Sequence, residues 1–183
     1  MLNNIAALVG NGAAAVGDYE SIQTYTVGAG GSSSIAFNSI PQTYKHLQIR
    51  VLARTGTADG MRMYYNADTG GSSANYTSHY LKGDGASATA GSYVGIGKFV
   101  TGQDLPAGAS IFSTSVIDIL DYTSTNKYKT FRALSGNDNN GSGSMQLASG
   151  IWISSTAALT DITLAPSTYS FTQYSSFALY GVK

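Results

Sequence analysis

The sequence has no cysteine and little charge, because only 11% of its 183 residues are Asp, Glu, Lys or Arg. Without cysteine, neither a disulfide framework nor a thiolate metal site can form. Ten Lys and Arg residues balance ten Asp and Glu residues, so the formal net charge is +0. A nucleic-acid-binding protein needs a basic surplus to neutralise phosphates, and we therefore expect no nucleic-acid partner.

General acids and bases are also scarce. The chain holds two histidines, His46 and His79, and a single glutamate, Glu20. A Ser-His-Asp triad needs a histidine that is oriented by an acid, and no G-x-S-x-G motif marks a nucleophilic serine. We therefore interpret both histidines as surface or hydrogen-bonded residues and expect a protein that is not an enzyme.

The nine aspartates do not form the carboxylate pair that a glycosidase requires. Most fall in segments typical of turns, where Asp side chains cap backbone groups. These are Asp59, Asp68, Asp84, Asp104, Asp121 and Asp138. Asp118 differs because it lies within the apolar run VIDIL, and we expect it to pair across strands with Arg132 or Lys129.

No cofactor or metal motif is present. The acidic and amide-rich run Asn137–Asn140 lacks the calcium-loop pattern with its closing glutamate. The glycine-rich runs GAGG and GIGK lack the spacing of phosphate-binding loops. We expect no cofactor and no bound metal.

The N-terminus carries a short apolar run from Ile5 to Val9. It has no basic segment before it and is too short to span a bilayer, so we expect neither a signal peptide nor a membrane partner. We interpret residues 1–17 as a docking arm and 18–183 as one β-sandwich domain, long enough to bury its own core. Within the arm, we expect Leu2, Ile5, Leu8 and Val9 to contact a partner.

Period-two alternation of apolar residues dominates the rest of the chain. In His46–Arg54, Leu47, Ile49, Val51 and Ala53 share one face, while the other face is polar except for Leu52. Similar segments recur, separated by glycine-rich turns. They cover 18–27, 34–40, 61–66, 92–97, 110–120, 129–136, 145–155, 159–166 and 175–183.

About eight to ten such strands at short spacing predict an all-β, antiparallel two-sheet sandwich that is jelly-roll-like. We expect 18–27 and 34–40 to pair as a hairpin. Segments 82–91, 101–110 and 137–144 are typical of loops, and 76–81 is compatible with a strand or with one helical turn.

Several segments resemble small virion proteins of tailed bacteriophages, frequent in phages of cyanobacteria and other aquatic bacteria. The similar segments are MLNNIAALVGNGAAAVGDYESI at the start, SIQTYTVGAGGSSSIAFNSIPQTYKHLQIRVLAR, YNADTGGSSANYTSHYLKGDG, IDILDYTSTNKYKTFRALSGNDNNGSG and the ending YSSFALYGVK. Proteins of this kind decorate capsids or belong to tail fibres. The resemblance implies a virion component without fixing its position, and it carries no catalytic motif.

Together these features predict a capsid decoration (cement) protein that is found in the virion and bridges neighbouring subunits of the major capsid protein or another virion protein. The low charge fits a surface that partners cover, and we expect a homo-oligomer. The alternative is a tail-fibre or spike module that binds host-surface glycan. It is motivated by the 13 tyrosines and by polar loops such as Ser135–Ser144.

Overall fold

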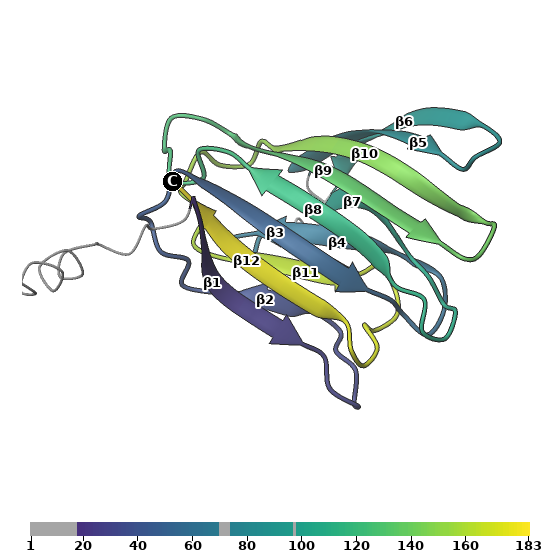
Figure 1. Cartoon of the computed structure of the whole chain (residues 1–183). Coiled ribbons are helices and arrows are strands. Elements are labelled where there is room, and N and C mark those ends of the chain that lie inside the picture. The colour runs from purple at the N-terminus through teal and green to yellow at the C-terminus, as the bar shows by residue number, and fades with distance from the viewer. Residues whose placement is uncertain (1–17, 70–73, 97) are drawn as a thin grey trace, which may run out of the picture.

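The computed structural model describes residues 18–69, 74–96 and 98–183 (Figure 1). All the regular structure in these residues is β-strand. The strands are β1 (Tyr19–Thr26), β2 (Ile35–Phe37), β3 (His46–Ala53), β4 (Asp59–Tyr65), β5 (Tyr76–Gly83), β6 (Ala88–Ile96), β7 (Phe99–Leu105), β8 (Ser113–Ile119), β9 (Lys129–Asp138), β10 (Gly143–Trp152), β11 (Ile162–Pro166) and β12 (Ser176–Val182).

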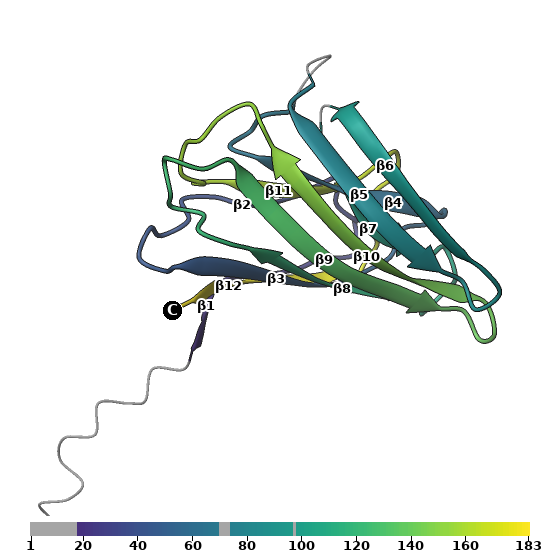
Figure 2. The same cartoon turned by 90° about the horizontal axis from the view of Figure 1, so that it is seen from above.

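The strands form two antiparallel sheets. The larger sheet has eight strands in the order β1-β12-β3-β8-β9-β10-β5-β6, and the smaller has four in the order β2-β11-β4-β7. Strands β5, β8, β9 and β10 all contact β7, so the larger sheet curves over the edge of the smaller one (Figure 2). The prediction of an all-β, antiparallel two-sheet sandwich is confirmed.

Alternation explains which face of each strand is buried. In β3, Leu47, Ile49, Val51 and Ala53 are buried, as the period-two pattern predicts. Burying each large aliphatic side chain contributes about 1.5–3 kcal/mol, which holds the sheets together. The opposite face of β3 remains on the outside of the larger sheet, and there the one apolar residue of that face, Leu52, is exposed.

A cluster of buried aromatic rings joins the two sheets. Phe99 of β7 packs edge-on against Tyr65 of β4, with ring centroids 5.0 Å apart, and against Phe131 of β9 at 4.6 Å. Phe99 also meets Tyr76 of β5 at 4.6 Å, and Trp152 of β10 lies 5.9 Å from Tyr65. Edge-to-face pairs add stabilisation beyond the area they bury, so this cluster fixes how the sheets stack.

The predicted hairpin between 18–27 and 34–40 is wrong. β1 pairs with β12, whereas β2 pairs with β11 in the other sheet. The connection between them therefore crosses from one sheet to the other, and Tyr25 and Phe37 meet with ring centroids 5.6 Å apart. Alternation marks a strand and its buried face but does not say which strand lies beside it.

The segment 101–110 is not wholly a loop, because β7 occupies its first half. Thr101 and Gln103 point inward, and these polar residues obscured the alternation. The Thr101 hydroxyl donates to the Met61 carbonyl at 3.0 Å, and the Gln103 amide donates to the Ser113 hydroxyl at 2.7 Å. Asp104 accordingly lies in a strand and not in a turn.

Other predicted loops are shorter than expected, for a similar reason. β6 begins at Ala88, β9 continues to Asp138 and β10 begins at Gly143, which leaves only 84–87 and 139–142 as connections. The ambiguous segment 76–81 is a strand, part of β5. These additions bring the count within the described residues to twelve strands, above the eight to ten expected.

The predicted arm, residues 1–17, lies outside the described residues, together with Leu2, Ile5, Leu8 and Val9. The described chain starts at Asp18, whose carbonyl accepts a hydrogen bond from the Lys183 N–H at 3.2 Å. Both ends of the described domain therefore lie together at one end of the sandwich (Figure 1).

Candidate interaction surface

The outer face of the larger sheet carries a row of exposed apolar side chains, here termed the apolar row. Val116 of β8 lies opposite Leu134 of β9, which lies opposite Leu147 of β10, which lies opposite Leu81 of β5. Their exposed fractions are 40%, 53%, 48% and 55%, in that order. Side chains directly opposite each other lie about 4.5–5.5 Å apart, so the four residues form a continuous strip across four strands.

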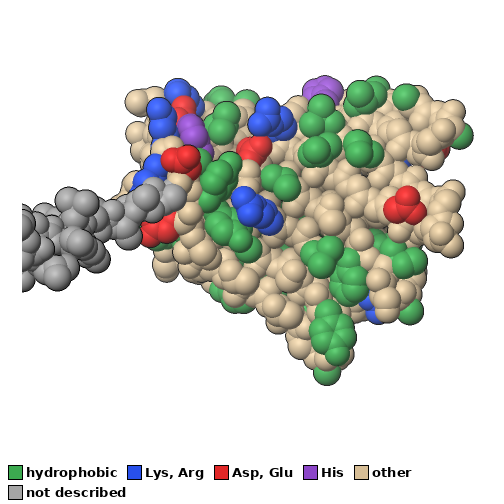
Figure 3. Space-filling model, viewed as in Figure 1, with side chains coloured by type: hydrophobic (Ala, Val, Ile, Leu, Met, Phe, Trp, Pro, Cys, Tyr) green, Lys and Arg blue, Asp and Glu red, His purple; other side chains and the backbone are tan. Residues whose placement is uncertain are grey.

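More apolar surface adjoins this row towards the loops. Met145 of β10 and Leu52 of β3 are both exposed on the same face. Each lies two residues nearer the loop end of its strand than the position that is level with the apolar row. Gly136 and Gly83, which have no side chains, lie opposite Met145 on its two neighbouring strands, and together these three residues line a hollow of about 710 Å³. Figure 3 shows this face, with green side chains gathered over β8, β9 and β10. Six of the exposed hydrophobic residues are thus grouped on this face.

A hydrogen-bonded chain of polar groups runs beside the apolar row. Arg132 donates to the Asp118 carboxylate at 3.0 Å, which confirms the predicted cross-strand pairing with Arg132. The Gln48 amide donates to the other oxygen of Asp118 at 2.9 Å, and Arg50 donates to Gln48 at 2.9 Å. Both carboxylate oxygens of Asp118 therefore accept a hydrogen bond on this face.

The guanidinium of Arg50 ends this polar chain between two tyrosine rings. It lies 4.6 Å from the ring centroid of Tyr180 and 5.3 Å from that of Tyr19. Aromatic faces attract a cation and hold it in place without neutralising it. With Arg132 and Asp118 paired, the positive charge of Arg50 remains available on this face.

Lys129, the other partner considered for Asp118, is buried elsewhere. Its ammonium donates to the carbonyls of Ser124, Lys127 and Thr156. Burial lowers the pKa of this ammonium. Lys129 therefore ties the β8–β9 connection to the β10–β11 connection, a role that sequence reasoning missed because carbonyl partners leave no sequence pattern.

The two histidines do not face a catalytic constellation in the described residues. The Nδ1 atom of His46 accepts a hydrogen bond from the Asp121 N–H at 3.0 Å. His79 is exposed on the outer face, with Ser149 opposite on β10 and Ser92 opposite on β6. Within the described part of the chain, neither imidazole accepts a hydrogen bond from a serine hydroxyl. Nor do those residues contain three His, Cys, Asp or Glu side chains placed to hold a metal ion.

Several aspartates act as the turn caps that the sequence predicts. The Asp84 carboxylate accepts from the N–H groups of Ala86 and Ser87, and Asp138 accepts from that of Asn140. Other aspartates assigned to turns act differently, since Asp104 forms an ion pair with Lys82 at 2.5 Å and Asp121 forms one with Lys127 at 2.7 Å. Among residues 18–69, 74–96 and 98–183, no helix has the length and apolar character needed to cross a membrane.

No protein-family model, curated protein or solved structure matches this chain. The resemblance to phage virion proteins therefore stays a prediction from the sequence segments that carry it.

Proposed function

We propose that this protein is a non-enzymatic structural protein of a bacteriophage virion that decorates the capsid and bridges its subunits. The observation that supports attachment is the apolar row, Val116, Leu134, Leu147 and Leu81, in direct register on an open sheet face. The virion setting is supported by the sequence resemblance alone. Large exposed apolar patches on folded domains mark contact surfaces.

The apolar row suits a contact that buries a broad area. A stable specific interface covers at least about 1,000 Å² in total, more than four side chains supply. The neighbouring side chains of Leu52 and Met145 extend the apolar centre, and the polar chain from Arg132 to Arg50 supplies a rim. An apolar centre with a polar rim is the usual anatomy of a protein–protein interface.

The charge on this face indicates the chemistry of the partner surface. Arg50 is held between Tyr19 and Tyr180 without an acidic partner in the described residues. A capsid surface with an apolar strip and a carboxylate beside it would bury the row and pair with Arg50. The predicted arm, residues 1–17, would add a second contact from the end of the sandwich where Asp18 lies.

Locating the protein in an electron-microscopy map of particles that contain it tests this proposal. We expect density for the sandwich on the head lattice, with the outer face of the larger sheet against capsid subunits. Absence of the protein from purified particles would refute the virion assignment. Density at the tail tip would instead support the alternative of a host-recognition module that binds glycan.

A further inference from the structure

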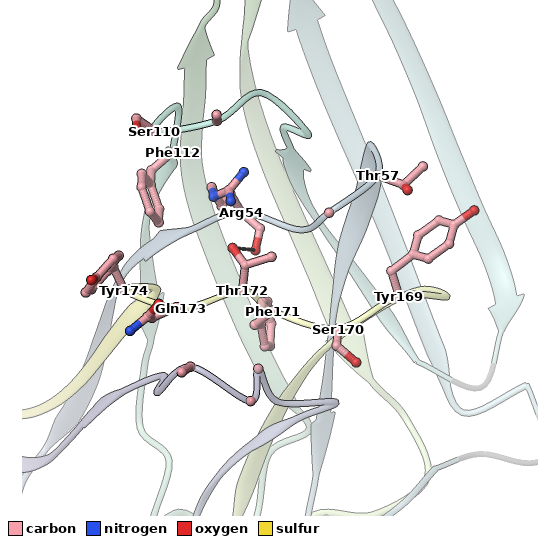
Figure 4. Close-up of a pocket in the computed structure, with 15 residues that line it drawn as sticks. Arg54, Thr57, Ser110, Phe112, Tyr169, Ser170, Phe171, Thr172, Gln173 and Tyr174 are labelled. Atoms are coloured by element: carbon pink, nitrogen blue, oxygen red, sulfur yellow. Dashed lines mark hydrogen bonds between the residues drawn. The ribbon is translucent and has the colours of Figure 1, made fainter.

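A second surface feature lies at the end of the sandwich opposite to Asp18, outside the apolar row. Four connections meet there, those between β1 and β2, β3 and β4, β7 and β8, and β11 and β12. They surround an open cavity of about 590 Å³, here termed the loop-end cavity (Figure 4). Binding sites are commonly built on loops that a rigid sheet scaffold positions, so this cavity is a candidate binding site.

Arg54 is the one charged residue among the described residues that line the loop-end cavity. Its Nη1 donates to the carbonyls of Gly108, at 2.9 Å, and Ala107, at 3.3 Å. Its guanidinium carbon lies 5.7 Å from the ring centroid of Phe112. These contacts fix the guanidinium plane at the cavity wall, as the sticks in Figure 4 show.

The other two guanidinium nitrogens of Arg54, Nε and Nη2, form a pair of adjacent donors, here termed the fork. Within the described chain, Nε and Nη2 have no hydrogen-bond partner, whereas Nη1 has two. Nε–H and the nearer N–H of Nη2 point in parallel, which is the geometry that lets them donate to both oxygens of one carboxylate. A planar fork held in place and left open is suited to a ligand carboxylate.

Three aromatic side chains line the same cavity as this fork. Tyr169 and Tyr174 line the cavity and are exposed, and Phe112 lines it beside Arg54. Tyr174 is 68% exposed although its backbone φ is 71°, a left-handed conformation that costs free energy for a bulky residue. Its N–H donates to the Val27 carbonyl at 2.9 Å, which holds the strained backbone in place.

Tyr169 is also positioned by specific contacts. The Asp59 carboxylate accepts hydrogen bonds from the N–H groups of Thr168, at 2.8 Å, and Tyr169, at 3.0 Å. Gly30 and Gly56 also line the cavity, and beyond their chain neighbours no heavy atom lies within 4 Å of where their Cβ atoms would be. The backbones of the two tyrosines are thus held at the cavity while the glycine positions leave open space.

We propose that the loop-end cavity binds a carbohydrate that carries a carboxylate, through Arg54 and the rings of Tyr169 and Tyr174. The fork pairs with the carboxylate, and the aromatic faces pack on the C–H face of a pyranose ring. Hexuronic and sialic acids share this chemistry. The site goes beyond capsid attachment, and its lining residues do not include the four residues of the apolar row.

Binding to the purified full-length chain tests this proposal without any particle. The probes are tetragalacturonate and 3′-sialyllactose, with cellotetraose and lactose as their neutral counterparts and tetraglutamate as a charged peptide. By calorimetry we expect one acidic sugar to bind with a Kd of about 1 mM or tighter, at least about tenfold tighter than its neutral counterpart. In ¹⁵N NMR spectra, the shifted signals should come from the four connections around the cavity.

Variants separate the roles of the fork and the rings. Arg54→Gln should weaken binding of the acidic sugar about tenfold or more and abolish its preference over the neutral sugar, because the fork is lost. Arg54→Lys retains the charge but not the fork, so it should bind the acidic sugar more tightly than Arg54→Gln and more weakly than the wild type. If Arg54→Gln does not fold, Arg54→Lys is the variant that tests the role of the fork. Tyr174→Gly removes a ring while relieving the left-handed strain, so weaker binding by this variant is not a folding effect.

Tyr128→Ala is the matched control for the tyrosine variants. Tyr128 is exposed, like Tyr174, but lies in the β8–β9 connection at the other end of the sandwich. We expect its removal to leave sugar binding unchanged. The proposal is overturned if neither acidic sugar binds, if neutral sugars bind equally well, if tetraglutamate binds more tightly, or if Arg54→Gln and Arg54→Lys both bind like the wild type.

Discussion

Replacing Leu134 with Asp should detach the protein from capsids. Leu134 occupies the middle of the apolar row between Val116 and Leu147, and about half of its side chain, 53%, is exposed in the free domain. Full burial of a leucine is worth about 1.5–3 kcal/mol, so covering the exposed half contributes about 1 kcal/mol. Leu134→Ala should therefore weaken attachment about fivefold.

An aspartate at this position also places a carboxylate between apolar side chains. Binding of the partner would strip the water from this carboxylate, which costs binding free energy. We expect a total loss of about 2 kcal/mol or more for Leu134→Asp, which is roughly a 30-fold weaker affinity. The assay is co-sedimentation of the purified protein with capsids that lack it, over a range of protein concentrations. The melting temperature should change little, because Leu134 points away from the core.

Leu120 offers a control of the same residue type and the same exposure. It is also 53% exposed, but it lies four positions along the chain from Val116, about 13 Å from the apolar row. Leu120→Asp should attach nearly as well as the wild type. Equal loss of attachment in the two variants, or no loss in either, would refute the assignment of the apolar row as the contact surface.

Four further outcomes follow from other parts of the molecule. The buried Tyr65 hydroxyl has no hydrogen-bond partner in the described residues, so Tyr65→Phe should raise the stability by up to about 1 kcal/mol in thermal unfolding. The Tyr76 hydroxyl donates to the Asp68 carbonyl at 2.7 Å and accepts from the Tyr65 N–H at 3.2 Å, so Tyr76→Phe should cost about 1–3 kcal/mol. Burial raises the pKa of the Asp59 carboxyl, but hydrogen bonds from Tyr169, Thr168 and Gly60 outweigh it and leave the pKa below its ordinary value. The stabilisation is therefore present above the unfolded pKa and lost as pH falls through the folded pKa, and the difference in melting temperature between wild type and Asp59→Asn should disappear once the pH is below the folded pKa. Deletion of residues 1–17 should preserve the β-rich circular-dichroism spectrum and weaken attachment, and normal decoration by the truncated protein would argue against a docking arm.

The candidate surface shows how far local sequence reasoning reaches. The pattern in 46–54 identified Leu52 as an apolar residue on a polar face, and the structure leaves it exposed. The apolar run VIDIL led to the prediction that Asp118 pairs with Arg132 or Lys129 across strands, and the structure shows the pair with Arg132. Both predictions depend only on alternation along a strand and on charge, which neighbouring residues in the sequence reveal.

The loop-end cavity could not be predicted in the same way. Arg54, Phe112 and Tyr174 come from three separate connections and meet only because the strands before them are stacked in two sheets. For the alternative of a glycan-binding module, the sequence instead pointed to polar loops such as Ser135–Ser144, which contains Asp138. In the structure, the Asp138 carboxylate is used to cap its own turn.

Period-two alternation, glycine-rich turns and composition alone determined that the chain is all-β and which residues of β3 form the core. The reason is that the two faces of one strand differ in hydrophobicity, whichever strands lie beside it. The order of strands, the crossing from β1 to β2 and the strand in 99–105 depended on the tertiary structure. Hydrogen bonds between strands join residues far apart in the chain, and their register aligned Leu81, Val116, Leu134 and Leu147 into one row. A surface assembled from four distant strands exists only once those pairings have formed.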